Sequence, residues 1–96
     1  MSKPSVNSVI ELLPSVSHQV LGRDQGGVVV QLESGDIFSV NDTAADFLKA
    51  ADGERTIADI AAMLAETYDA PAETIAADLV EITEGLIAEK VVQVKA

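Results

Sequence analysis

Few residues in this 96-residue sequence are of the types that do chemistry, and their spacing does not bring them together. His18 is the only histidine and there is no cysteine, which excludes a histidine-dependent triad, a multi-histidine metal centre, a thiolate site and a disulfide. His18 falls inside an apparent strand, where we expect a partly exposed structural residue. The sequence therefore predicts no metal ion and no cofactor.

Carboxylates are plentiful, but we expect them on solvated surfaces. The pairs Asp42 with Asp46 and Glu81 with Glu84 fall on the polar faces of expected helices. Catalytic carboxyls need a pocket that shifts their pKa, and nothing in the pattern builds one. Ser34 in "LESGD" lies between two expected strands, unlike the helix-opening serine that carries the prosthetic arm of an acyl carrier protein. The sequence therefore predicts a protein that is not an enzyme.

The charge of the chain excludes several classes of partner. Sixteen acidic and six basic residues give a net charge of −10, and the basic residues are scattered. Nucleic acids and anionic membrane surfaces are bound through clustered Lys and Arg, so we expect neither as a partner. The N-terminus has no signal-peptide pattern and no stretch approaches a membrane span, so we expect a soluble cytoplasmic protein.

The first half of the chain has the alternation and turn residues of β-structure. Residues 16–21 and 28–33 are rich in β-branched residues and are separated by "GRDQGG", while "SG" precedes a third strand at 36–40. These segments predict a three-stranded antiparallel meander. Residues 1–14 fit a short strand, a helical turn or an arm, and residues 91–94 fit a short strand or an extended tail.

The second half predicts three helices. Asn41 is a good N-cap for the first, and Asp52-Gly53 is expected to end it. Thr56 with Asp59 resembles a capping box that opens the second, and Pro71 fits the first position of the third. The second helix has one apolar face, formed by Ile57, Ile60, Ala61, Leu64 and Tyr68. The third has two apolar rows, Ile75, Leu79, Ile82 and Leu86 in one and Ala76, Val80, Thr83 and Ile87 in the other.

Three strands followed by three helices argue for an α+β domain with the meander packed on the helices. The third strand, 36–40, contains no Pro and no Lys, so nothing on it prevents another chain from pairing with its edge. The third helix has more apolar surface than one packing partner requires. It either forms the wall of a groove beside that edge, or both of its rows are core.

The stretch "SGDIFSVNDTAADFLKAADGERTIADIAAML" resembles the PqqD family, and "YDAPAETIAADLVEITEGLIAEKVV" continues the resemblance, which covers roughly residues 15–95. The order and spacing of the matching residues carry it, rather than any single motif. The matching positions are Phe38, Val40, Asn41, Ala44, Asp52, Gly53, Ile57, Ile60, Leu64, Tyr68, Asp78, Leu79, Leu86, Lys90 and Val91.

The resemblance implies a RiPP recognition element, a small winged-helix-like domain that binds the leader segment of a ribosomally made precursor peptide. It implies a peptide-binding domain at 15–96, preceded by the arm at 1–14. The leader is expected to add as a strand beside residues 36–40 and to lie against the third helix. The implied peptide-binding residues are Asp36, Ile37, Phe38, Ser39, Val40, Ile75, Asp78, Leu79 and Ile82.

The implied function is that of a non-catalytic adaptor that delivers the precursor peptide to a modifying enzyme. Val40 stands where the family usually has Leu, and "VVVQLESG" lacks the sequence motif common in proteins dedicated to pyrroloquinoline quinone synthesis. A radical-SAM or a lasso-peptide system therefore fits as well as pyrroloquinoline quinone synthesis. The alternative is a regulatory or dimerisation domain of the same topology without a leader peptide, and the open edges also permit a homodimer.

Overall fold

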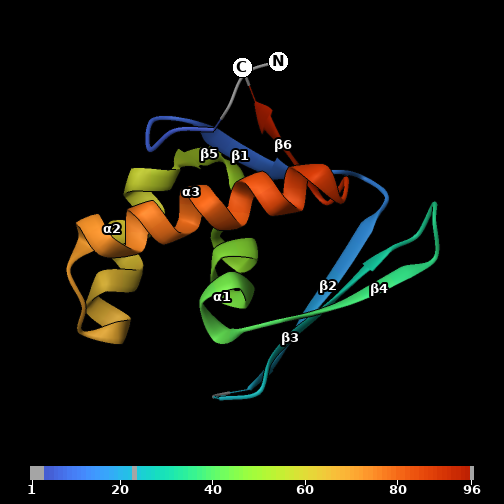
Figure 1. The fold of residues 1–96 in the computed structure, drawn as a ribbon, viewed down its shortest axis with the longest axis horizontal. Coiled ribbons are helices and arrows are strands. Elements are labelled where there is room, and N and C mark those ends of the chain that lie inside the picture. Colours follow the sequence, from blue (N-terminus) through green and yellow to red (C-terminus); the bar gives the residue numbers. More distant parts are fainter. Residues whose placement is uncertain (1–3, 23, 96) are drawn as a thin grey trace.

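The computed structural model describes residues 4–22 and 24–95, which form six strands and three helices. Helix α3 crosses the molecule in front of α1, from the end of α2 to the start of the last strand (Figure 1). The elements run in the order β1 (Val9–Leu12), β2 (Val16–Gly22), β3 (Gly26–Gln31), β4 (Asp36–Val40), α1 (Asp42–Ala50), β5 (Asp52–Thr56), α2 (Ile57–Tyr68), α3 (Ala72–Ala88) and β6 (Val92–Lys95).

Strands β2, β3 and β4 form the predicted antiparallel meander, with β3 in the centre. The register places His18, Val29 and Phe38 in one row across the three strands, on the face that packs toward the helices. Residues of the next row, such as Ile37, point to the opposite face, where Ile37 is 69% exposed. The α+β, winged-helix-like prediction is confirmed, and His18 is a half-buried strand residue.

A second antiparallel sheet, in the order β5-β1-β6, was not expected. Strand β1 lies between the other two, pairing Val9 with Thr56 on one side and with Lys95 on the other. Of the three forms that residues 1–14 fit, the structure has a strand at 9–12, and residues 91–94 also belong largely to a strand. Ile10 of β1 is fully buried. A domain boundary at residue 14 stays a prediction.

Helix α1 begins as predicted and ends earlier than predicted. The Asn41 side chain accepts a hydrogen bond from the Ala44 N–H at 2.9 Å, which is the N-cap contact. The helix stops at Ala51, whose N–H donates to the Phe47 carbonyl. Gly53 does not close it, because Asp52 and Gly53 already belong to β5 and Gly53 has its positive φ of 80° within that strand.

The starts of α2 and α3 are set by Thr56 and Pro71. Thr56 accepts from the Asp59 N–H and Asp59 accepts from the Thr56 N–H, each at 3.1 Å, so the predicted capping box is confirmed. Pro71 lies one position earlier than predicted, at the N-cap of α3 rather than at its first helical residue. Its carbonyl accepts from the Ile75 N–H, so proline still opens the helix.

One core joins both sheets to all three helices. Ile10 from β1 and Val29 from β3 meet Phe47 of α1, Ile60 of α2 and Leu79 of α3, and each of these five side chains is fully buried. The apolar face of α2 is as predicted, except that Tyr68 is 36% exposed. The core thereby holds both the meander and α3 against α1.

Candidate functional site

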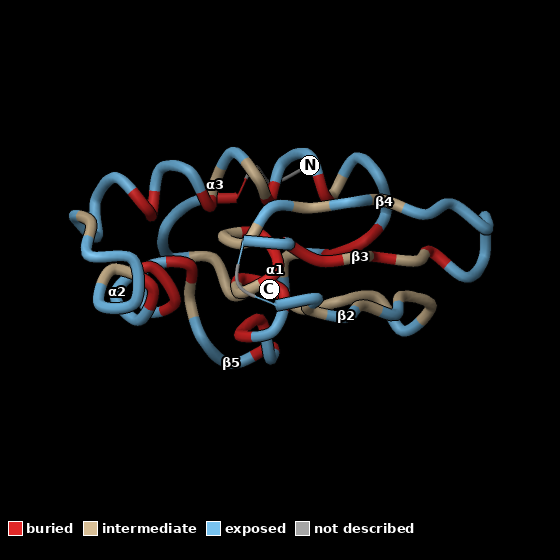
Figure 2. The backbone as a smooth tube through the Cα atoms, turned by 90° about the horizontal axis from the view of Figure 1, so that it is seen from below, coloured by how far each residue is buried: buried red, intermediate tan, exposed pale blue. Residues whose placement is uncertain are grey.

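The edge of β4 is unpaired along its outer side in the described part of the chain. β4 pairs with β3 alone, and in the view from below the order is α3, β4, β3 and β2 (Figure 2). The free edge of β4 therefore faces α3. In a two-stranded pairing, alternate residues direct their N–H and C=O groups away from the partner, so β4 offers unpaired backbone groups toward this helix.

An open groove separates β4 from α3. Its apolar part has a volume of about 390 Å³. Its polar end has a volume of about 310 Å³ and shares Asn41 and Ile82 with the apolar part. The lining of the apolar part is Phe38, Ser39, Val40, Asn41, Ala44, Ile82, Gly85, Leu86 and Glu89, and the polar end adds Thr43, Asp78 and Glu81.

The strand residues predicted for the site lie at or beside this groove. Phe38 and Val40 are half-buried, pack against the core and line the groove, while Ser39 lines it from the edge. Asp36 and Ile37 are exposed on β4 but are not among the lining residues. The structure brings three of the five predicted strand residues together with α3.

The helix residues predicted for the site divide into two groups. Asp78 is exposed and Ile82 is half-buried, and both line the groove. Ile75 and Leu79 are 6% and 0% exposed, so their side chains lie in the core behind the groove and do not line it. Ile75 and Leu79 are therefore core residues, which is the second of the two alternatives that the sequence left open for this apolar row.

The junction that follows β4 holds one end of the free edge. Asn41 caps α1, and the next residue, Asp42, accepts from the Asp24 N–H at 2.7 Å and from the Gly26 N–H at 2.6 Å. Gly26 must be glycine, because its φ is 67° and a Cβ there would lie 2.0 Å from the Val40 carbonyl oxygen. These contacts tie the β2–β3 turn to the end of β4 and to the start of α1.

Gln31, a residue not predicted to take part in the site, links the other end of the meander to the helices. Its side chain is 5% exposed; Nε2 donates to the Lys90 carbonyl at 2.7 Å, and Oε1 accepts from the Glu33 N–H at 2.9 Å. This polar side chain occupies an inward position of β3, in the same alternation as buried Val29, and that was the available signal. Gln31 thus connects the meander to the residue that follows the C-cap of α3.

The helix wall of the groove is acidic. α3 contains four acidic residues and no basic one, and Glu89 follows at its C-cap. Asp78 and Glu81 line the polar end, while Lys90, next to Glu89, is the nearest basic residue in sequence. The potential in the polar end is therefore negative, which favours a cationic side chain in an occupant.

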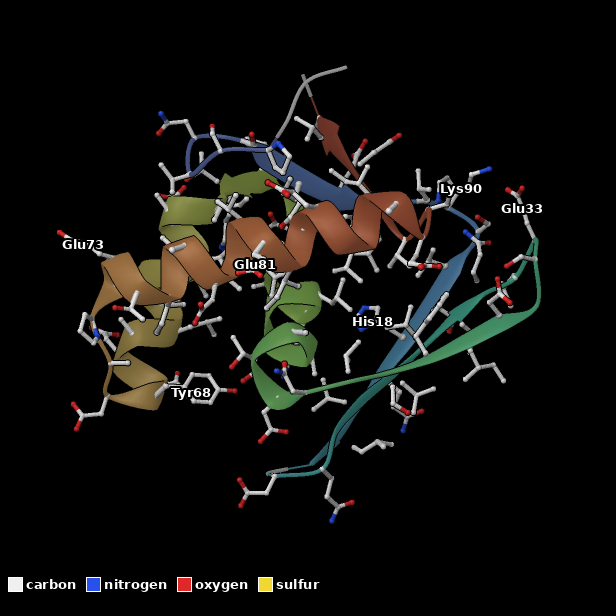
Figure 3. The ribbon with its side chains drawn as sticks, in the orientation of Figure 1. His18, Glu33, Tyr68, Glu73, Glu81 and Lys90 are labelled. Carbon is white, nitrogen blue, oxygen red and sulfur yellow. The ribbon has the colours of Figure 1, made fainter. Side chains whose placement is uncertain are left out.

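A second hollow, of about 480 Å³, lies between the β2–β3 turn and the helices α1 and α2. Tyr68 reaches from α2 toward α1, where its hydroxyl donates to the Asp46 carboxylate (Figure 3). Burial and this hydrogen bond to Asp46 together raise the pKa of Tyr68 well above its usual value. Asp42 and Asp46, which line this hollow, both accept hydrogen bonds from other parts of the chain.

Residues 4–22 and 24–95 contain no group of three or more histidine, cysteine or carboxylate residues placed to hold a metal ion. Over the same ranges, none of the helices combines the length and the apolar character required to span a bilayer.

A small α+β domain with a free strand edge beside an apolar groove has the geometry that β-strand addition uses. The family model of PqqD, coenzyme PQQ synthesis protein D, matches residues 26–92, which is more than half of the sequence. The chain belongs to the PqqD family, as the resemblance predicts.

Among curated proteins, the bifunctional coenzyme PQQ synthesis protein C/D of Methylorubrum extorquens is 38% identical over 56 residues. The matched stretch is 58% of this chain and only 15% of that protein, so the chain corresponds to a small part of this relative.

Three solved structures share the fold. The PqqD truncation of Methylobacterium extorquens PqqCD, described as a functional and stand-alone RiPP recognition element, is 30% identical with a TM-score of 0.80, and 94% of each chain is covered. Lasso peptide synthetase B1, solved with a leader peptide, is 23% identical with a TM-score of 0.73, over 90% of this chain and 99% of the other. TbiB1, solved with the TbiA(beta) leader peptide, is 15% identical with a TM-score of 0.74, over 90% and 98%.

Proposed function

We propose that this protein binds the leader segment of a ribosomally synthesised precursor peptide by β-strand addition along β4, and that it presents the peptide to a modifying enzyme without catalysing a reaction itself. One observation carries the proposal: the unpaired edge of β4 faces α3 across an open groove. Membership of the PqqD family and the likeness to a stand-alone recognition element support it. The modifying enzyme belongs to a pyrroloquinoline quinone, radical-SAM or lasso-peptide pathway.

The leader peptide would be recognised in two ways. Its backbone would pair with the free groups of β4, between Asp36 and Val40, which gives affinity without reading sequence. Its side chains on one face would enter the groove between Phe38 and Ile82. A Lys or Arg of the leader would lie at the polar end, near Asp78 and Glu81.

The test is titration of the isotope-labelled protein with synthetic leader peptides of precursors encoded near its gene, followed by NMR. We expect saturable shifts on residues 36–40 and on the groove-facing side of α3. Shifts that depend on protein concentration and occur without peptide would instead favour the dimerisation alternative.

Peptides methylated on alternate backbone nitrogens sharpen the test. In an added strand, the N–H groups of every second residue bond the neighbouring strand and the others point away. Methylation of one set should abolish binding, while methylation of the other set should leave it nearly unchanged. Equal effects of the two sets would refute strand addition.

The acidic end of the groove can be tested separately. Asp78→Asn and Glu81→Gln should each weaken the binding of a leader that carries Lys or Arg by about two- to fivefold, the usual range for an exposed ion pair, and less at high salt. Glu84→Gln is the matched control, since Glu84 is exposed on the same helix but does not line the groove. An equal effect of all three variants would mean that only net charge matters.

A further inference from the structure

Gly85 is a costly residue at its position in α3. It lies in the last third of a 17-residue helix, three residues before the helix ends, and glycine in a helix loses more backbone entropy on folding than alanine does. Nothing in the described structure requires it. A Cβ built at Gly85 meets no atom within 4 Å, and its backbone has no positive φ.

The missing side chain leaves space on the helix side of the apolar part of the groove. Gly85 is exposed and lies one turn beyond Ile82 on the side of α3 that faces β4, opposite Phe38 and Val40. Leu86 and Ala44, both buried, form the apolar floor around it. Gly85 itself lines this open groove of about 390 Å³, and a β-carbon there would stand in open space, so a longer side chain has room to occupy part of the groove.

We infer that Gly85 determines specificity, because it makes room for one large apolar side chain of the leader peptide. The inference rests on the proposed function and adds what the groove selects. The anchor side chain lies over the Gly85 backbone, between Phe38 on the strand and Ile82 on the helix. Leaders with a small residue at this point bind weakly, because the apolar walls of the groove stay hydrated. Leaders with a charged residue there bind weakly because the charge loses its hydration without gaining a partner.

The inference predicts opposite effects on stability and on binding. Gly85→Ala removes the entropic cost of a glycine inside the helix, so it should raise the melting temperature by roughly 2–8 °C. Its methyl group also fills part of the groove, so it should weaken peptide binding by about three- to tenfold. Gly85→Leu should close the groove and weaken binding by more than about thirtyfold, by the same overpacking argument. If the fold itself required glycine at this position, Gly85→Ala would instead lower the melting temperature.

Thr74→Ala is the matched control. Thr74 is exposed on the same helix and does not line the groove, and alanine there also raises helix propensity. It should raise the melting temperature without changing peptide affinity. A loss of affinity in Thr74→Ala as large as in Gly85→Ala would show that stiffening of the helix, rather than filling of the groove, is responsible.

The experiment uses a displayed library of random twelve-residue peptides, selected separately on the wild-type protein and on Gly85→Leu. We expect the wild type to enrich one large apolar position, and Gly85→Leu to lose that preference. Replacing the enriched residue by alanine should weaken binding to the wild type at least about tenfold while changing affinity for Gly85→Leu little. If both proteins select the same sequences, this inference is wrong and the proposed function stands. If the wild type selects no extended peptide, both are wrong.

Discussion

Gln31→Leu removes the link between the meander and the end of α3. The two side chains are of similar size, so the substitution deletes the hydrogen bonds to the Lys90 carbonyl and from the Glu33 N–H without leaving a large cavity. A typical hydrogen bond contributes about 0.5–1.5 kcal/mol net, and a stranded buried partner costs about 1–3 kcal/mol. Both hydrogen bonds are only partly buried, so the lower values apply.

We therefore expect the free energy of unfolding to fall by about 2 kcal/mol. For a domain of this size, 1 kcal/mol corresponds to a shift of about 4–8 °C, so the melting temperature should fall by roughly 8–16 °C. Thermal unfolding followed by far-ultraviolet circular dichroism measures the shift. Amide hydrogen exchange at Glu33 should accelerate in the same variant, because its N–H loses its acceptor.

Two further variants separate this explanation from others. Gln19→Leu makes the same exchange at an exposed position of β2 and should change the melting temperature little. Gln31→Glu keeps an acceptor for the Glu33 N–H but sets a carboxylate against the Lys90 carbonyl, so it should destabilise at least as much as Gln31→Leu. Gln31→Leu and Gln19→Leu proteins that melt within about 2 °C of each other would refute the linking role, since the expected difference is several times larger.

The remaining predictions concern caps and one titration. Asn41→Ala and Thr56→Ala each remove an N-cap contact and should each lower the free energy of unfolding by about 1 kcal/mol in chemical denaturation; unchanged midpoints would contradict the capping roles. Tyr68 is the only tyrosine, so phenolate absorbance reports it alone, and its raised pKa should keep it protonated in the folded protein above pH ~10, the pKa of a free tyrosine. The pKa of Tyr68 is higher in the folded than in the unfolded protein, so protonated Tyr68 contributes to the stability of the fold. That contribution is complete at neutral pH and is lost as the pH rises from ~10 toward the folded-state pKa. Asp46→Asn should move the ionisation of Tyr68 to lower pH, and a wild-type midpoint near 10 would show that the environment of Tyr68 does not shift it.

Local signals predicted the parts of the fold that local interactions determine. The strands of the meander follow each other through glycine-containing turns, so alternation and turn residues were enough for β2 and β4, whose bounds agree within one residue. The capping box at Thr56 was recognisable because its two members lie three residues apart. β3 both begins and ends two residues earlier than the predicted 28–33, running from Gly26, where glycines had indicated only a turn, to Gln31.

The second sheet was not predictable because its pairing is non-local. "DGERT" has little β propensity, yet it forms β5, since the backbone of β1 offers it hydrogen bonds from residues more than 40 positions away. Non-local contacts also limited what the sequence could predict of the candidate site. The free edge and the groove-lining Asp78 and Ile82 were visible in the pattern, but the contact from Gln31 to Lys90 spans 59 positions and depends on the complete fold. Ile75 and Leu79 share an apolar row with Ile82, and only the packing shows which of the three faces outward.

The placement of β1 between β5 and β6 has a consequence for how the domain folds. Strand β1, at residues 9–12, pairs with β6, at residues 92–95, so the second sheet is complete only when two segments far apart in the sequence have met. Until then Ile10 lacks the shelter that β6 helps to provide, and the long interval between the two partners makes this closure slow. Before β6 docks, the folding chain therefore carries a β1 strand with one unpaired edge, which is open to pairing with another copy of the chain.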